Sequence, residues 1–494
     1  MEKLSCVKVP VYFSGHHEAH AASAFYPSPF ERAAILTLDG VGEWTTTALG
    51  RGNGPQIELL RELRFPHSLG LLYSAFTHYC GFRVNSGEYK LMGLAPYGEP
   101  RFAETIRQNL IDLRDDGSFQ LNLGYFGYLH GQKMTNDRFA ALFGAPARKP
   151  EEALTQQHCD LARSIQEVTE EIVLRLVRTL HNDTGEENLC LAGGVALNCV
   201  ANGRLLREGP FRHIWVQPAA GDAGGALGAA LALHHMHFNA PRSAPQTDAM
   251  HGAFLGPEYG DDEILQAVND AGLTARRLNN DELHLYLAQQ IADSKVVGFF
   301  QGRAEFGPRA LGARSILADA RSPQMQSQLN LKIKFRESFR PFAPIVLAER
   351  AAEYFDLTAP SPYMLFTAPV LASRRTKSDS GVRELSARVH EIRSDIPAVT
   401  HLDYSARVQT VDIRENPVLH SLLTAFDRLT GCPVMINTSF NVRGEPPVCH
   451  PREAIACFLD TGIDILALGN YVIEKSALPP ELLAKRKPRT FAPD

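Results

Sequence analysis

Two histidines near the start of the chain and an aspartate that follows them have the residue types of a metal site. His16 and His20 are four residues apart, so on a helix both imidazoles lie on one face. Asp39 ends an apolar, strand-like run. Two imidazoles with a distant carboxylate are typical of iron, zinc or manganese sites. The alternative is a pair of structural histidines at a helix start, and an Asp-Gly turn after a strand is common.

The same segment does not fit a zinc protease. That motif has Glu directly after the first histidine and a second histidine four positions on. His17 and Glu18 would then require a histidine at position 21, where the chain has Ala21. A protease is therefore excluded, and a different metal chemistry is expected.

Two glycine turns in the first half each lie between an expected strand and an expected helix. They are Gly193-Gly194, followed by residues 195–198, and residues 221–225, which include Asp222. Glycines let backbone N–H groups approach an anion, and a helix N-terminus favours negative charge. Two such turns in one domain predict a nucleotide between two lobes. Tight strand–helix packing is the alternative, since neither turn is a Walker A loop or a Gly-x-Gly-x-x-Gly motif.

A group of cations in the second half predicts a phosphate site. These cations alternate with apolar residues, which favours strands and loops whose charges converge on a pocket; they are Arg303, Arg309, Arg314, Lys332, Lys334, Arg336 and Arg340. Arginine holds phosphate by two-point contacts, and lysine acts as a point charge. Asn437, Ser439 and Asn441 follow a buried strand and could meet the same ligand. A solvated basic face and an Asn/Ser-rich turn remain the alternatives.

The elements that would position these residues alternate between strands and helices. Apolar residues at three- and four-residue steps predict a helix over 158–181. Further expected strands are 33–38, 45–49, 188–192, 213–216, 296–300 and 434–436, and further expected helices are 226–235, 281–293 and 451–460. This alternation indicates an α/β fold. The composition predicts a first domain over 1–240, a linker over 241–257, a second domain over 258–486 and a tail over 487–494.

Composition sets outer limits on function. The chain has 494 residues, of which 44% are hydrophobic and 21% charged, with a net charge of -5. This charge gives no sign of a nucleic-acid or membrane partner. The eight cysteines form no Cys-x-x-Cys pair, and no apolar run reaches the length of a membrane span. These features predict a cytoplasmic protein with reduced thiols.

Six segments together give the chain a resemblance to the O-carbamoyltransferases of the nodulation and cephamycin type, the NodU/CmcH family. They occur in the family's order and span nearly the whole chain; they are residues 16–24, 88–98, 192–198, 307–312, 339–344 and 437–446. The resemblance implies an actin/sugar-kinase-like (ASKHA) first domain and a YrdC-like α/β second domain. In the family, the second domain turns carbamoyl phosphate and ATP into carbamoyl adenylate. The first domain transfers the carbamoyl group to a hydroxyl.

The resemblance also implies roles for individual residues. The metal ligands would be His16, His20, Asp39 and Asp222. The catalytic residues would be Lys90, Asn198, Arg309 and Lys334. Substrate and nucleotide would be bound by Gly193, Gly194, Arg336, Arg340, Arg407, Asn437, Ser439 and Asn441.

The implied cofactor is a divalent metal, with Fe(II) as the expected ion. ATP and carbamoyl phosphate are the expected co-substrates, with Mg²⁺ accompanying ATP. The expected partner is a small-molecule hydroxyl acceptor, a natural product or a sugar, with no nucleic acid and no membrane. Two other functions remain open: threonylcarbamoyl transfer to tRNA, and a nucleotide-binding partner subunit without turnover.

One departure from the family pattern concerns the start of the chain. A longer segment usually precedes the histidine motif, which here begins at His16. Without the strands of that segment, the first sheet would expose an edge. A start placed too late, a reduced form of the domain, or strands supplied by another chain would each account for this. A homodimer or such a partner chain is therefore among the expected assemblies.

Overall fold

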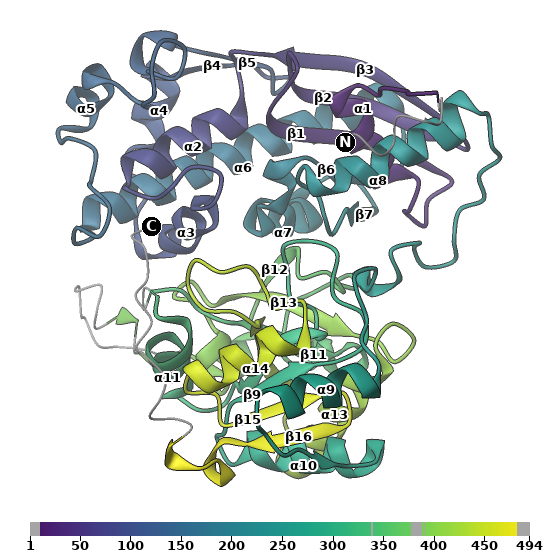
Figure 1. Cartoon of the computed structure of the whole chain (residues 1–494). Coiled ribbons are helices and arrows are strands. Elements are labelled where there is room, and N and C mark those ends of the chain that lie inside the picture. Colours follow the sequence, from purple (N-terminus) through teal and green to yellow (C-terminus); the bar gives the residue numbers. More distant parts are fainter. Residues whose placement is uncertain (1–9, 337–338, 377–387, 390, 482–494) are drawn as a thin grey trace.

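The chain folds into two α/β units, one above the other in Figure 1. The structure, a computed structural model, describes residues 10–336, 339–376, 388–389 and 391–481. A five-stranded sheet forms the centre of the first unit, and a nine-stranded sheet forms the centre of the second. The predicted mixed α/β class is confirmed.

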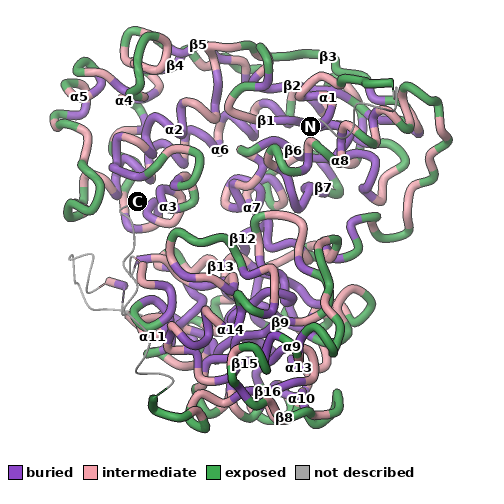
Figure 2. The backbone as a smooth tube through the Cα atoms, viewed as in Figure 1, coloured by how far each residue is buried: buried purple, intermediate pink, exposed green. Residues whose placement is uncertain are grey.

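The first sheet combines antiparallel and parallel strands in the order β3-β2-β1-β6-β7. Its strands are β1 (Arg32–Gly42), β2 (Thr45–Asn53), β3 (Gln56–Arg64), β6 (Asn188–Ala192) and β7 (His213–Val216). The pairs β1–β6 and β6–β7 are parallel, whereas β1–β2 and β2–β3 are antiparallel. Central β1 and β6 are mostly buried, while β3 is an exposed edge (Figure 2).

Helices cover this sheet and extend the first unit to one side. They are α1 (His16–Phe25), α2 (Leu69–Tyr79), α3 (Glu88–Leu94), α4 (Ala103–Asn109), α5 (Asp137–Phe143), α6 (Gln156–Thr184), α7 (Cys199–Glu208) and α8 (Ala223–Ala232), with a small hairpin of β4 (Ile111–Leu113) and β5 (Phe119–Leu121). The long helix α6 buries the predicted apolar stripe and ends at Gly185, which has a φ of 64°. Glycine adopts this left-handed conformation at low cost, so it terminates the helix.

Helix α1 is held at its far end by one buried arginine. Arg242 donates to the main-chain carbonyls of Phe25 (2.9 Å), Ser28 (3.1 Å) and Phe30 (2.9 Å). Its guanidinium also lies over the Phe25 ring, 4.3 Å from the centroid. A cation at a helix C-terminus satisfies carbonyls that lack partners within the helix. Arg242 lies in the predicted linker, yet it is part of the interior of the first unit.

The second unit is built on a mixed sheet in the order β12-β13-β11-β14-β10-β9-β15-β16-β8. The strands are β8 (Arg276–Arg277), β9 (Val297–Phe300), β10 (Arg314–Asp319), β11 (Ala343–Leu347), β12 (Phe366–Pro369), β13 (Ser405–Val411), β14 (Val434–Ser439), β15 (Ile465–Leu468) and β16 (Tyr471–Glu474). The α-helices are α9 (Asp261–Asp270), α10 (Asn280–Ala292), α11 (Met325–Leu329), α13 (Pro417–Thr430) and α14 (Pro451–Asp460). Their apolar faces and the central strands form a second buried core.

The two units dock through polar contacts as well as packing. Helix α7 lies against β12 (Figure 1), where the Asn202 amide donates to the Leu365 carbonyl at 3.1 Å. On the other side of the junction, His401 bonds the Gly93 carbonyl at 3.1 Å. Asp248, in the connecting segment, accepts from Trp215 of the first unit and Tyr363 of the second. The junction is therefore a specific interface.

Most predicted elements have the predicted type. The expected strands 188–192 and 213–216 and the helix 451–460 match to the residue, and the helix 158–181 extends to Gln156–Thr184. The domain boundaries stay a prediction, since the first core reaches Met250 and Ala253 within the expected linker. The tail 487–494 lies outside the described residues. No described helix is both long and apolar enough to cross a membrane.

Candidate functional site

The four residues predicted as metal ligands meet at one point. His16 Nε2 lies 3.0 Å from His20 Nε2 and 2.8 Å from Asp39 Oδ2. Asp222 Oδ1 lies 3.6 Å from both imidazole nitrogens. One ligand atom from each of the four residues falls within 4.8 Å of all the others. His20 is buried, whereas Asp222 is largely exposed, so the cluster opens to solvent on the Asp222 side.

The topology explains why these residues converge. Strands β1, β6 and β7 are parallel neighbours, so their carboxyl ends lie at the same edge of the sheet. Asp39 is near the end of β1, and Asp222 follows β7 at the start of α8. Helix α1 brings His16, its first residue, and His20, one turn further along, to this edge. Ligand sites in open α/β sheets commonly form at this edge.

Two glycines make room for the cluster. Gly193 has a φ of 90°, and a Cβ there would overlap the Leu38 backbone. A Cβ on Gly42 would overlap the His16 ring. The next residue, Gly194, donates its backbone N–H to Asp39 Oδ1 at 3.2 Å. The first glycine turn is thereby joined to the carboxylate of the predicted metal site.

Within this cluster, the histidines stabilise the ionised Asp39 carboxylate, and Asp39 stabilises the protonated form of His16. Burial favours the neutral form of Asp39, but the bonds from His16 and His20 outweigh it and hold its pKa well below the usual range. The hydrogen bond to Asp39 raises the pKa of His16. The neighbouring His17 is different: burial and the nearby His20 lower its pKa to about 4. His17 bonds Thr37 and the Thr45 carbonyl, which gives it a structural role.

The donor set fits a divalent transition metal. Two imidazole Nε2 atoms face each other at 3.0 Å, an arrangement that a shared cation between them would satisfy. Nitrogen and carboxylate oxygen donors together suit Fe(II), Mn²⁺ or Zn²⁺. Asp39 also accepts the Gly194 N–H, the kind of supporting contact that orients metal ligands. His16, His20, Asp39 and Asp222 are therefore the residues that would hold the ion.

In the second unit, Lys334 is a buried amine surrounded by neutral oxygen atoms. Its Nζ donates to Asn441 Oδ1 (2.8 Å), the Asn441 carbonyl (3.1 Å), Ser439 Oγ (3.2 Å) and the Ser439 carbonyl. Burial, and secondarily the charge of Arg336, lower the pKa of Lys334 well below its usual range. In the described part of the chain its acceptors include no carboxylate. An incoming anion would relieve this cost.

Arg309 brings a second cation to the domain junction. Its guanidinium donates to the Leu197 carbonyl of the first unit at 3.4 Å, while its Nε is buried without a partner among the described residues. Burial, then the nearby charges of Arg407 and Arg340, lower the pKa of Arg309 to about 9. Three arginines thus share one region, and like charges so close together favour an anionic ligand.

Asn437 lies beside this region, within β14. Its Nδ2 donates to the Ala310 carbonyl (3.0 Å) and to Gln409 Oε1 (2.8 Å). Its Oδ1 is buried and has no hydrogen-bond partner in the described chain. A buried acceptor without a partner is costly, so this oxygen is available to a ligand donor.

Two further predicted cations lie against aromatic rings. Arg336 bonds Asn330 Oδ1 at 2.8 Å and lies over the Phe342 ring. Arg340 lies over the ring of Tyr89, which belongs to the first unit, 4.5 Å from its centroid. The charge of Arg340 lowers the pKa of both Lys334 and Arg309, which places it within range of both. We call Arg309, Lys334, Arg336, Arg340 and Arg407 the junction cations.

Three other residues of the predicted cation group have different surroundings. Arg303 and Lys332 are exposed. Arg314 is fully buried and donates to the carbonyls of Gln301, Gly302 and Pro257, so it has a structural role. The expectation that all seven cations converge on one pocket is therefore wrong for Arg314, and it stays a prediction for Arg303 and Lys332. Alternation with apolar residues does not separate a ligand-facing cation from one that binds backbone carbonyls.

The first-unit residues expected at the transfer site are both buried. Lys90 Nζ lies 5.9 Å from the Phe82 ring centroid. Asn198 exchanges hydrogen bonds with the Gln166 side chain and caps α7 by accepting from the Ala201 N–H at 3.1 Å. Asn198 therefore supports the local backbone, and the catalytic role expected for it stays a prediction.

One supporting residue was missed by the sequence analysis. The Glu305 carboxylate accepts from the backbone N–H groups of Leu311 (2.7 Å), Ala313 (2.8 Å) and Arg314 (3.1 Å). These bonds fold the loop that carries Arg309. A lone glutamate before a Gly-Pro segment has no sequence signal that would reveal this role.

Comparison with known proteins identifies the family of this α/β protein, which carries a candidate metal site and the junction cations. Residues 3–231 match the family Carbamoyltransferase N-terminus, and residues 288–475 match Carbamoyltransferase C-terminus. The chain belongs to the carbamoyltransferase family and is accordingly a transferase. The resemblance inferred from the six sequence segments is confirmed.

Three relatives show how far the likeness extends. An uncharacterized protein of Synechocystis sp. is 55% identical over 95% of this chain and 77% of its own length. Nodulation protein NolO of Bradyrhizobium diazoefficiens is 37% identical, over 97% of this chain and 84% of the relative. Nodulation protein NolNO of Sinorhizobium fredii is 39% identical over 95% of this chain, but the match spans only 65% of that longer protein.

A solved structure of HypF from T. kodakarensis is also similar to part of the chain. It shares 16% sequence identity and covers 48% of this chain and 38% of its own, with a TM-score of 0.27. A likeness at this level supports no conclusion about fold or function.

Proposed function

We propose that this protein is an ATP-dependent O-carbamoyltransferase that acts on a hydroxyl of a small molecule, a natural product or a sugar. The observation that carries the proposal is the set of junction cations in a chain of the carbamoyltransferase family. Lys334 has only neutral oxygen partners in the described chain, and Arg309 has an unused buried donor. Such groups suit two anionic co-substrates, carbamoyl phosphate and ATP.

The second unit would form carbamoyl adenylate from carbamoyl phosphate, ATP and water, releasing inorganic phosphate from carbamoyl phosphate and pyrophosphate from ATP. ATP and carbamoyl phosphate repel each other, so fixed cations are needed to hold them together. Lys334 and Arg309 would bind the phosphates, supported by Arg336, Arg340 and Arg407. Each charge-assisted contact contributes about 1.5–3 kcal/mol. Asn437 Oδ1 would accept from a donor such as the carbamoyl amide.

The first unit would transfer the carbamoyl group from carbamoyl adenylate to the acceptor hydroxyl, with release of AMP and the hydroxyl proton. A divalent metal held by His16, His20, Asp39 and Asp222 would supply Lewis-acid polarisation or anchor a phosphate. Fe(II) is the metal we favour, and Mg²⁺ would accompany ATP. The N–H of Gly194 points at Asp39 and holds this carboxylate in place. The adjoining Gly193-Gly194 turn supports nucleotide binding at the same edge.

Further parts of the proposal rest on the sequence resemblance. They are the actin/sugar-kinase-like identity of the first unit and the YrdC-like identity of the second. A homodimer or a partner chain is also proposed on that basis. A cytoplasmic location is proposed instead from the composition, in which the eight cysteines form no Cys-x-x-Cys pair. The net charge of -5 weighs against tRNA as the acceptor.

Pyrophosphate release by the purified chain tests the division of labour. We expect release with ATP and carbamoyl phosphate, and none with ATP, threonine and bicarbonate. Lys334→Ala should abolish release, whereas its exposed neighbour Lys332→Ala should retain it. His20→Ala should retain release but lose carbamoylated product. Release driven by threonine and bicarbonate would favour tRNA modification, and no release under either condition would favour a subunit without turnover.

A further inference from the structure

A single turn of the first unit contacts both candidate sites. This turn, residues 193–198 including the short helix η4 (Gly194–Leu197), donates the Gly194 N–H to Asp39 Oδ1 at 3.2 Å. At its other end, the Leu197 carbonyl accepts from Arg309 of the second unit at 3.4 Å. The position of this turn therefore sets the positions of a predicted metal ligand and of a junction cation together. We call it the bridging turn.

The bridging turn is fixed at its last residue by a buried glutamine. Gln166 lies in the middle of α6 and is completely buried. Its Oε1 accepts from Asn198 Nδ2 (3.0 Å) and the Tyr73 hydroxyl (3.0 Å), and its Nε2 donates to Asn198 Oδ1 (3.1 Å) and Glu170 Oε1 (3.0 Å). Four hydrogen bonds use the full capacity of a primary amide.

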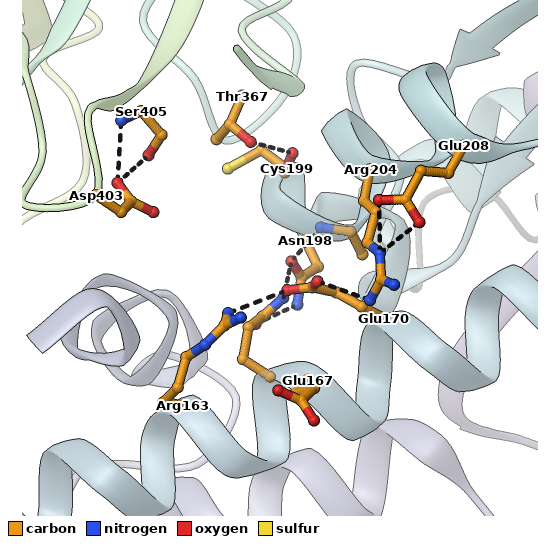
Figure 3. Close-up of polar contacts among 12 residues, drawn as sticks. Arg163, Glu167, Glu170, Asn198, Cys199, Arg204, Glu208, Thr367, Asp403 and Ser405 are labelled. Atoms are coloured by element: carbon orange, nitrogen blue, oxygen red, sulfur yellow. Dashed lines mark hydrogen bonds and ion pairs between the residues drawn. The ribbon is translucent and has the colours of Figure 1, made fainter. Parts of the chain in front are cut away.

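The outer end of this network is anchored by charge. Figure 3 shows Glu170 on α6 facing Asn198, with Arg163 and Arg204 on either side. Arg204 lies 3.3 Å from Glu170 Oε2, and Arg163 lies 3.8 Å from Glu170 Oε1. A buried polar network in which every member has partners holds its side chains in one arrangement. Gln166 thus connects the ion-paired Glu170 to the bridging turn.

We propose that Gln166 is a positioning residue that holds the bridging turn so that Asp39 and Arg309 keep a fixed relation to each other. Gln166 touches neither site directly and acts through Asn198. Its loss would leave the Asn198 amide without its reciprocal partner and free the end of the turn. The Gly194 N–H would then no longer be held against Asp39, and metal affinity would fall. This inference rests on the proposed function only for the roles of the two sites.

Manganese binding to the metal-free full-length chain tests the proposal. Mn²⁺ affinity, measured by electron paramagnetic resonance, should be about tenfold weaker in Gln166→Met, because supporting contacts to metal ligands are worth about 10- to 100-fold. Tyr73→Phe deletes only a hydroxyl of the network and should give a smaller loss. The matched control is Thr169→Val on the same helix, whose hydroxyl is buried without a partner in the described chain. This variant should bind Mn²⁺ as the wild type does.

The measurement separates positioning from general stability. Affinity is read on folded protein well below the thermal midpoint, where a residue with a purely structural role would leave it unchanged. Wild-type Mn²⁺ affinity in both Gln166→Met and Tyr73→Phe would overturn the proposal. If Gln166→Met does not fold, the Mn²⁺ affinities of Tyr73→Phe and Gln166→Glu are compared with that of the wild type. Weaker binding supports the proposal, and wild-type affinity in both variants overturns it. Absence of pyrophosphate release by the wild type would refute the proposed function but leave this metal-binding result intact.

Discussion

The Tyr97 hydroxyl of the first unit donates a 2.9 Å hydrogen bond to the main-chain carbonyl of Phe339 in the second. Both residues are buried, and their rings meet edge to face. Phe339 directly precedes Arg340, so the same stretch of backbone is held by the first unit and carries a junction cation. The bond therefore links docking of the two units to the geometry of the candidate phosphate site.

Tyr97→Phe should weaken this docking. The substitution leaves the Phe339 carbonyl without its donor in a buried setting, which costs about 1–3 kcal/mol. We expect a lower free energy of unfolding in urea and faster proteolysis at the junction. Tyr125→Phe, in the short helix η3 (Leu123–Tyr125), is the control and should leave both unchanged. Equal stability of the two variants would show that the bond contributes little to docking.

The metal site predicts a simple stoichiometry. Protein purified without chelators should contain about one transition-metal ion per chain, because four donors converge at one point. The double variant His16→Ala/His20→Ala should lose the ion by elemental analysis. His213→Ala removes an exposed histidine of β7 and should keep it. Retention of metal in the double variant would place the ion elsewhere.

Arg309→Met should weaken carbamoyl phosphate binding and raise the thermal stability of the protein. The guanidinium is close to Arg407 and Arg340, and its Nε lacks a partner in the described chain, so its removal relieves repulsion and raises the thermal midpoint. Loss of one charge-assisted contact of about 1.5–3 kcal/mol should raise the KM for carbamoyl phosphate about 10- to 150-fold. Arg303→Met, at an exposed arginine of the same segment, should change neither. An Arg309→Met variant that is both less stable and fully active would contradict this account.

Stability near neutral pH should depend on Glu415. Burial and the nearby carboxylates of Asp248 and Asp412 raise the pKa of Glu415 from 4.5 to about 7. The folded chain therefore holds this proton more tightly than the unfolded chain does. The resulting stabilisation is complete below pH 4.5 and is lost as the pH rises through about 7.

Thermal midpoints across this pH range provide the measurement. Glu415→Gln removes the titrating group, so its midpoint should fall less than that of the wild type as the pH rises from about 5 to 8. Glu258→Gln replaces an exposed carboxylate and should follow the wild type. Identical pH profiles for Glu415→Gln and the wild type would rule out this contribution.

Local patterns were sufficient for much of the fold and for part of the first site. The place of Asp222 among the metal ligands came from the family resemblance. The spacing of His16 and His20 determines that they share a helix face, and the apolar run before Asp39 places it directly after the buried part of β1. Strands β6 and β7 were predicted to the residue because short apolar runs between turn residues are a local signal. Parallel pairing then brings their ends together.

Features that depend on long-range contacts could not be predicted from the sequence. Gln166 occupies a polar position next to an apolar stripe, and nothing in the helix pattern shows that it meets Asn198 from another element. Arg314 and Arg309 are both arginines of one basic segment. Only the tertiary structure shows that Arg314 bonds interior carbonyls while Arg309 reaches the other unit.

The buried Arg242 has a practical consequence for anyone who wishes to produce the two halves of this enzyme separately. Its side chain holds carbonyls at and just beyond the end of α1, although in sequence it lies after α8 and within the expected linker. A cut at residue 240 would assign this arginine to the wrong fragment. The N-terminal piece would then lose the anchor of the helix that carries both histidines, and reassembly would require the C-terminal piece to return a single side chain to an interior position. A cut that keeps Arg242 with the first fragment avoids this defect.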